Sequence, residues 1–192
     1  MAEGAARRAS YGASADLPAG NDRSPPNRSP LAVLDLSAAH PDVLVLVGTQ
    51  TGNSEIVAEA VADALGGLGF AAHVLDMAEA VPDDLAGYRQ LVAVTCTWSG
   101  GTFPDNAVEY VEALEALAPD LAGLAFGVVG LGDRDYDPFY QTAARRLDAL
   151  LATLGAHRAA APCEIDGGPT AAHIDGARAW ATRLAAAFGE KG

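Results

Sequence analysis

Three short segments carry residue types that bind a small ligand. Residues 49–54 (TQTGNS) place hydroxyls and a row of backbone N–H groups just before an apolar pattern of helical spacing. Residues 95–106 set Trp98 beside Ser-Gly-Gly, and residues 130–140 set Tyr136 among glycines and acids. Backbone N–H groups at a helix start suit a phosphate, and Trp and Tyr suit a planar ring. Together the segments predict a site for a flat aromatic ring with one terminal phosphate.

Each segment also has an ordinary structural explanation. Asn53 or Ser54 is a common helix N-cap, and on the first segment alone capping and phosphate binding stay equal alternatives. Trp98 also suits a half-buried loop position, and the acids around Tyr136 suit a turn with a capping Asp. It is less expected that all three features occur together by accident than that any one of them does. The combination of the three segments therefore favours a ligand site.

Composition and motif counts exclude several classes. The chain of 192 residues has a formal charge of −13, which disfavours nucleic-acid and membrane binding and predicts partners with basic surfaces. Lys191 is the only lysine, so lysine-dependent chemistry is excluded. No G-x-x-x-x-G-K or G-x-G-x-x-G motif occurs. The two Cys and four His show no metal-ligand spacing, so no metal is expected. Sparse cysteine and the absence of a long apolar stretch predict a cytoplasmic protein.

The hydrophobic pattern alternates between strand and helix from residue 42 onward. Strands are expected at residues 43–47, 70–75, 91–95, 124–130 and 158–165. Helical spacing is found at residues 56–68, 108–117, 143–154 and 174–188. This alternation predicts an α/β fold, a doubly wound five-stranded parallel sheet. Residues 1–40, rich in Ala, Gly, Ser and Pro, are expected to form a disordered tail ahead of one domain at 41–192.

The three segments resemble known motifs. VGTQTGNSE resembles the FMN phosphate loop of the flavodoxin family, TCTWSGG its flavin loop with a stacking Trp, and GLGDRDYDPF its second flavin loop. LGAHRAAAPCEIDGGP resembles the stretch around the family's last strand. The chain therefore resembles a short-chain flavodoxin over residues 42–188. The resemblance implies strand order 2-1-3-4-5 and non-covalent FMN.

The resemblance also assigns residues to the cofactor. It implies that the phosphate is held by Thr49, Thr51, Asn53 and Ser54, with the backbone of Gln50 and Gly52. Trp98 and Tyr136 would sandwich the ring. The polar edge of the ring would meet Thr97, Gly132 and Asp133, and the cofactor site would also include Ser99, Gly100 and Gly101.

Four positions depart from the family pattern. Two of them, Gln50 and Ser54, stand in the phosphate loop where Thr is common, and both still fit. Cys96 stands where a hydroxyl residue often helps to bind phosphate, and it is left out of the predicted site. Ser99 stands where many members have Gly, at a peptide that turns its carbonyl toward the reduced flavin N5–H. A left-handed backbone costs a non-glycine residue about 1 kcal/mol. We therefore expect weaker stabilisation of the flavin after one electron, unless Gly100 takes over the role.

The expected function is electron carriage rather than catalysis. By resemblance, the chain would be a low-potential one-electron carrier that moves electrons between a flavodoxin or ferredoxin reductase and acceptor enzymes. Acids near the ring, Asp105, Asp133, Asp135 and Asp137, would lower the potential of the second electron and meet basic partners. We expect a monomer with no catalytic residue.

Other functions stay open. An FMN-dependent quinone or flavin reductase on the same fold is the alternative, although no nicotinamide motif is visible. A non-redox regulatory domain that kept the fold is a third class. A piece of a larger diflavin reductase is less expected, because the chain ends soon after its last helix.

Overall fold

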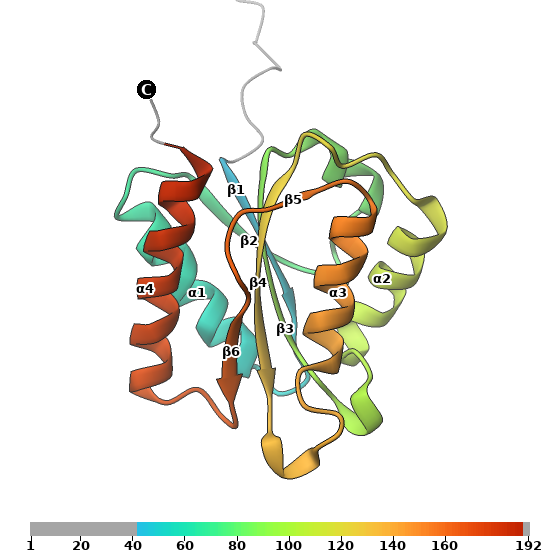
Figure 1. Ribbon diagram of the computed structural model, residues 1–192, viewed down its shortest axis with the longest axis vertical. Helices are drawn as coiled ribbons and strands as arrows, with labels where there is room; N and C mark the ends of the chain where they lie inside the picture. The colour runs from blue at the N-terminus through green and yellow to red at the C-terminus, as the bar shows by residue number, and fades with distance from the viewer. Residues whose placement is uncertain (1–41, 190–192) are drawn as a thin grey trace, which may run out of the picture. The chain divides into compact units, whose positions relative to one another are not determined.

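The computed structural model describes residues 42–189, and their core is a parallel sheet covered by helices on both faces (Figure 1). The strand order is β2-β1-β3-β4-β5, as expected for a flavodoxin-like doubly wound sheet. The strands are β1 (Val43–Gly48), β2 (Ala72–Asp76), β3 (Gln90–Cys96), β4 (Ala125–Gly132), β5 (His157–Arg158) and β6 (Cys163–Asp166). The pairs that these strands form are all parallel, so their C-terminal ends meet at one edge of the sheet.

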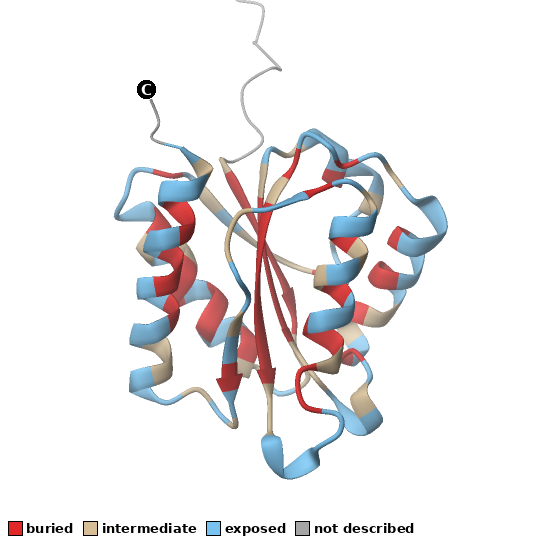
Figure 2. Cartoon of the chain, viewed as in Figure 1, coloured by how far each residue is buried: buried red, intermediate tan, exposed pale blue. Residues whose placement is uncertain are grey.

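The central strands are mostly apolar because both faces are buried (Figure 2). Along β1, Val43, Val45 and Val47 enter one hydrophobic cluster, while Leu44 and Leu46 enter the other. This alternation follows from the two-residue period of a strand. A continuous Val/Leu run therefore feeds two cores at once, one on each side of the sheet.

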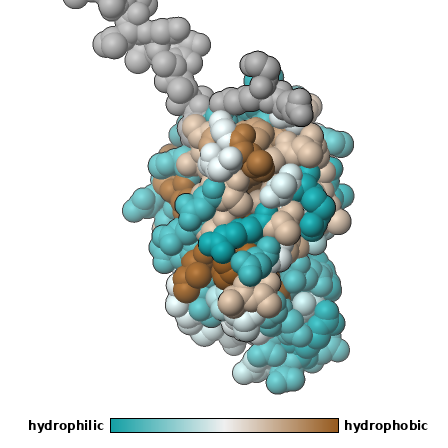
Figure 3. All heavy atoms as spheres, turned by 90° about the vertical axis from the view of Figure 1, so that its left-hand side faces the viewer, coloured by the Kyte–Doolittle hydropathy of each residue, from teal (hydrophilic) through white to brown (hydrophobic). Residues whose placement is uncertain are grey.

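Within residues 42–189, four helices cover the sheet. They are α1 (Asn53–Gly66), α2 (Asp105–Leu117), α3 (Thr142–Thr153) and α4 (Ala171–Phe188). Residues of α1 and α4 pack into one cluster, and residues of α2 and α3 pack into the other. Seen from the side of α1 and α4, apolar surface patches are small and separated by hydrophilic side chains (Figure 3). Short 3-10 turns, η1 (Pro82–Gly87), η2 (Ser99–Gly101) and η3 (Arg134–Tyr136), lie in the connections.

The expected continuous fifth strand at 158–165 is wrong, because two short strands take its place. β5 pairs with the start of β4 and β6 with its end. The Ala159 N–H still donates to the Phe126 carbonyl at 2.8 Å, and residues 160–162 then leave the sheet. Pro162 has no N–H to donate to a ladder. The Trp180 indole donates to the Ala161 carbonyl at 2.8 Å, and its ring lies so close to Gly127 that a Cβ there would sit at 2.8 Å. The buried indole therefore holds the edge strand away from β4 at this point.

The predicted disordered tail at residues 1–40 lies outside the described residues. Within residues 42–189, no helix is both long and apolar enough to cross a membrane. The same residues contain no cluster of three or more His, Cys, Asp or Glu side chains suited to a metal ion.

Candidate functional site

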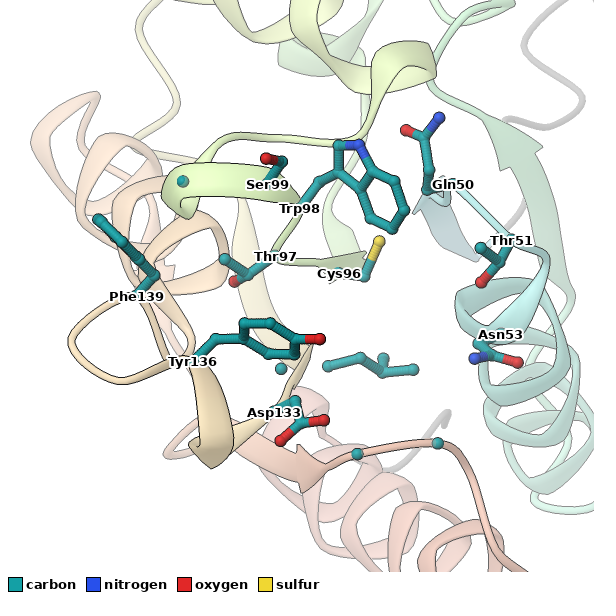
Figure 4. A pocket seen from close by; sticks show the side chains of 15 residues that line it. Gln50, Thr51, Asn53, Cys96, Thr97, Trp98, Ser99, Asp133, Tyr136 and Phe139 are labelled. Atoms are coloured by element: carbon teal, nitrogen blue, oxygen red, sulfur yellow. The ribbon is translucent and has the colours of Figure 1, made fainter.

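A pocket of about 540 Å³ opens at the C-terminal edge of the sheet, where the loops after β1, β3 and β4 meet. Figure 4 shows Trp98 and Tyr136 on one side of this space and Thr51 and Asn53 on the other. The pocket is lined by Gln50, Thr51, Asn53, Cys96, Thr97, Trp98, Ser99, Gly100, Leu131, Gly132, Asp133, Tyr136, Phe139, Gly167 and Gly168.

The β1–α1 loop ends in a helix start without a side-chain cap. Gly52 is the N-cap residue, with φ 85° and ψ −8°, a left-handed conformation that suits glycine. Neither Asn53 nor Ser54 caps the helix, so the capping explanation of these residues does not hold. The first N–H groups of α1 thus lack the usual side-chain acceptor, and the positive end of the helix dipole lies at the pocket.

Side chains from α2 fix the shape of this loop. The Asn106 carbonyl oxygen accepts from the Thr49 N–H at 2.8 Å, and its amide donates to Asp76 Oδ1 at 2.9 Å. Gln50 and Asp105 form a reciprocal pair: Gln50 Nε2 donates to Asp105 Oδ2 at 3.0 Å, and the Asp105 N–H donates to Gln50 Oε1 at 2.9 Å. Hydrogen bonds to Asp105 and Asn106 at the start of α2 therefore fix the conformation of the β1–α1 loop.

Ser54 supplies an unmatched polar group at this end of the site. Its side chain is fully buried, and Oγ has no hydrogen-bond partner among the described residues. An unsatisfied buried hydroxyl costs about 1–3 kcal/mol, so it is rarely kept without a use. A hydroxyl and uncapped N–H groups at a helix start are the donors that a phosphate accepts. These residues therefore fit a phosphate group.

The ring end of the site is much more exposed. Trp98 is 44% exposed, Tyr136 is 71% exposed, and Phe139 is 44% exposed. Trp98 comes from the loop after β3, while Tyr136 and Phe139 come from the loop after β4. Exposed aromatic side chains at a pocket mouth suit stacking on a planar ligand, because the ligand would cover surface that water now contacts.

The Trp98 loop is a tight turn in which the glycines carry the unusual backbone. The Gly101 N–H donates to the Trp98 carbonyl at 2.9 Å, and Gly100 has φ 66° and ψ 19°. Ser99 is not among the residues with positive φ. In this conformation the left-handed position therefore falls on Gly100, and Ser99 bears no such strain. The expected effect of Ser99 on the reduced flavin stays a prediction.

The start of α3 ties the Trp98 loop to the rest of the site. The Thr142 hydroxyl lies 2.9 Å from the Gly101 carbonyl, to which it donates, and the Ala143 N–H donates to Thr97 Oγ1 at 3.3 Å. The buried Gln141 amide donates to the carbonyls of Gly130 and Ile165, at 3.0 and 3.1 Å. One helix start thus joins the loop after β3 to the ends of β4 and β6.

Among the acids predicted to lie near the ring, Asp133 lines the pocket, and its carboxylate caps η3 by accepting from the Asp135 N–H at 2.9 Å. Asp135 and Asp137 are exposed on the same loop. Asp105 pairs with Gln50 instead, at the phosphate end.

The structure brings most of the predicted site residues together. Ten of the predicted fourteen line the pocket, whereas Thr49, Gly52, Ser54 and Gly101 do not. Thr49 Oγ1 accepts from the Gly52 N–H at 3.0 Å and so shapes the loop from behind. Direct contact of each residue with a cofactor stays a prediction.

The sequence reasoning left Cys96 out of the predicted site, yet Cys96 lines the pocket. It also missed four other lining residues: Leu131, Phe139, Gly167 and Gly168. Phe139 belonged to the quoted GLGDRDYDPF motif, and the two glycines follow the last strand, so both signals were present in the sequence. The Gly167 N–H donates to the Gly132 carbonyl at 2.7 Å, which brings the loop after β6 to the pocket.

The Cys96 thiol lies at the end of β3, inside the pocket. Burial raises the pKa of this thiol, and the Gln50 backbone and the Ser54 hydroxyl nearby lower the pKa by less. The thiol is thus protonated at neutral pH and uncharged. An uncharged group at this position does not repel a phosphate.

Comparison with known proteins decides the family. The model of the flavodoxin family matches residues 45–180. The chain belongs to the flavodoxin family. The flavodoxin of Streptococcus pneumoniae TIGR4 superposes with a TM-score of 0.69 at 28% identity, over 75% of this chain and 97% of that one. A short-chain flavodoxin associated with a bacterial microcompartment gives 0.68 at 27% identity, over 74% and 95%.

The relatives found by sequence comparison are larger proteins than this chain. The sulfite reductase [NADPH] flavoprotein alpha-component of Neisseria meningitidis is 35% identical over 186 residues, which is 96% of this chain and 28% of that protein. The component of the same name from Bacillus subtilis is 35% identical over 145 residues, 72% of this chain and 24% of that protein. The chain thus spans only about a quarter of the length of these relatives.

Flavodoxins bind FMN, and this chain is an FMN-binding electron-transfer protein by family. The site fits that cofactor on its own features: the orphaned Ser54 hydroxyl and uncapped α1 start suit the phosphate, and the exposed aromatics suit the ring.

Proposed function

We propose that the chain is a low-potential one-electron carrier that uses non-covalently bound FMN and passes electrons between a reductase and acceptor proteins. The observation that carries this proposal is one pocket lined by both the uncapped α1 loop and the exposed Trp98 and Tyr136. Bound FMN supplies the redox chemistry. No pocket residue in this proposal acts as a general acid, general base or nucleophile.

The chain's own residues bind and tune the cofactor. Thr51, Asn53 and Ser54 would hold the phosphate, and Trp98 and Tyr136 would shield the ring faces from water. Asp133 would place a negative charge beside the ring edge. A carboxylate there disfavours added negative charge on a reduced ring, which lowers its reduction potential.

The charge distribution supports basic partners. Residues 42–133 contain fourteen acids and one arginine, whereas residues 134–189 contain six acids and six arginines. The whole net charge of −13 in the described residues thus lies in the first part. Arg134, Arg145, Arg158 and Arg178 pair with acids of the second part, and Arg146 pairs with Glu115 of the first. A basic protein would therefore be attracted to the surface formed by residues 42–133, which include α1, β2 and α2.

The similarity to sulfite reductase flavoprotein components suggests which acceptor to test first. We propose that a sulfite-reducing enzyme with a basic docking surface is one such acceptor, and that carrier and acceptor meet in the cytoplasm. The carrier itself would act as a monomer.

Anaerobic stepwise reduction of the purified chain, followed by visible absorbance, tests the proposal. A one-electron carrier gives two resolved one-electron steps with bound FMN. A single two-electron step with NADPH oxidation by the pure protein would instead support the flavin or quinone reductase alternative. A chain that does not bind added FMN would refute the cofactor assignment and with it the carrier function.

A further inference from the structure

Cys96 is a nucleophilic side chain inside the pocket that electron transfer does not use. It ends β3, and in Figure 4 it lies between the Trp98 ring and Thr51. A ligand whose ring lies at Trp98 and whose phosphate lies at Thr51 and Asn53 must therefore pass this thiol.

A second observation concerns a buried hydroxyl at the same end of the pocket. The buried Ser54 hydroxyl, which has no hydrogen-bond partner among residues 42–189, lies beside the thiol, and the Gln50 backbone is also near. The thiol therefore borders the position that the unmatched hydroxyl and the helix start prepare for a phosphate. An added group on sulfur would occupy that volume.

We propose that Cys96 is a modification site for low-molecular-weight disulfides, and that a mixed disulfide on Cys96 and bound FMN exclude one another. This inference rests on the proposed FMN site and deepens it. The flavin-free chain accepts the modification, and the FMN-loaded chain is protected. Binding of FMN to the chain then depends on whether the Cys96 thiol is free or carries a mixed disulfide.

The reaction is thiol–disulfide exchange. The Cys96 thiolate attacks one sulfur of a disulfide RS–SR, the new bond Cys96 S–SR forms, and RS⁻ leaves and takes up the proton that Cys96 lost. Cys96 is oxidised while one half of the disulfide is reduced to a thiol. A second thiol reverses the exchange and frees Cys96.

The pH dependence follows from the burial of the sulfur. Because the pKa of Cys96 is raised above its ordinary value, only a small fraction is thiolate at pH 7. The exchange rate rises about tenfold per pH unit until the pH reaches the raised pKa, where it levels off. The modification is therefore slow at neutral pH and faster in mildly alkaline solution.

Cys163 gives a matched control within the chain. It is partly buried, as Cys96 is, and burial is also the main cause that raises its pKa. It lies on β6, outside the residues that line the pocket. FMN should therefore leave the reactivity of Cys163 unchanged.

The experiment uses dithiodipyridine, a neutral aromatic disulfide whose released thiopyridone is followed by absorbance. The full chain carrying Cys163→Ser reports on Cys96 alone, and the chain carrying Cys96→Ser reports on Cys163 alone. Each is treated at several pH values without flavin and with saturating FMN. FMN binding by each untreated chain, followed by quenching of flavin fluorescence, is measured first.

We expect FMN to slow the modification of Cys96 at least tenfold and to leave that of Cys163 within a factor of two. The Cys96 adduct should lose FMN binding, with at least a tenfold higher dissociation constant, and dithiothreitol should restore it. The proposal is overturned if Cys96 fails to react without flavin, reacts equally fast with FMN, or binds FMN normally as the adduct. Failure of the untreated chains to bind FMN would instead refute the proposed cofactor site, and this inference with it.

Discussion

The two ends of the pocket are built differently. At the phosphate end, the loop after β1 is fixed by Asn106 and the Gln50–Asp105 pair, and the Ser54 hydroxyl is fully buried. At the ring end, Trp98 and Tyr136 are 44% and 71% exposed. The phosphate end is thus preorganised before a ligand arrives, while the ring end exposes surface that a ligand or partner can cover. We infer that the first sets cofactor affinity and the second sets ring environment and electron exchange.

The largest effect is expected from the residue that fixes the phosphate end. Asn106→Ala removes the acceptor of the Thr49 N–H and the donor to Asp76. We expect the free energy of unfolding to fall by about 2–3 kcal/mol, because a partly buried polar network loses its centre. Urea unfolding measures this change, and FMN binding should weaken in parallel. Glu112→Ala, an exposed change on the same helix, is the control and should alter neither.

The second-largest effect distinguishes binding of the FMN phosphate from binding of the flavin ring. Ser54→Ala removes a hydroxyl that is buried without a partner. We expect the FMN dissociation constant to rise about 30-fold, since a hydrogen bond to a charged group contributes about 2 kcal/mol. Riboflavin, which lacks the phosphate, should bind unchanged. The flavin-free variant should be at least as stable as the original chain, because the unsatisfied hydroxyl is gone.

If riboflavin binding fell as much as FMN binding, Ser54 would act on the whole loop rather than on the phosphate. Ser54→Thr, which keeps a hydroxyl, is the matched variant for fluorescence titration with both flavins.

A change at the ring end should weaken the binding of FMN and of riboflavin alike. Trp98→Ala removes one exposed aromatic face, and we expect FMN and riboflavin to lose the same affinity, about tenfold or 1.5 kcal/mol. Equal losses for the two flavins, measured by the same titration, would place Trp98 on the ring. A loss confined to FMN would contradict the assignment of the two ends.

The smallest effect is expected at the link between the loops. Thr142→Val removes the hydroxyl that donates to the Gly101 carbonyl. We expect about 1 kcal/mol of lost stability and an FMN affinity lowered about fivefold, because the Trp98 turn loses one hydrogen bond. Thr142→Ser should restore both in thermal unfolding and flavin titration. Equal behaviour of the Val and Ser variants would mean that the hydroxyl does not position the turn.

The elements of the fold could be predicted from the sequence because each has a local cause. The Val/Leu run at 43–47 is continuous since both sheet faces are covered, and the Gly-rich ends mark the loops. The break between β5 and β6 could not be predicted in this way. It depends on Trp180, whose indole reaches Ala161 and packs on Gly127, and these residues are far apart in sequence.

The site divides in the same way. The sequence was enough to predict which three segments meet at the pocket, because phosphate loops and stacking aromatics are short local patterns. Which groups line the pocket depends on the three-dimensional packing: Thr49 accepts a hydrogen bond from the Gly52 N–H, Cys96 lies in the pocket, and the Gly167 N–H donates to the Gly132 carbonyl. A parallel sheet gathers strand ends that are distant in sequence. The direction of each side chain there is set by packing and hydrogen bonds between loops, which no local pattern records.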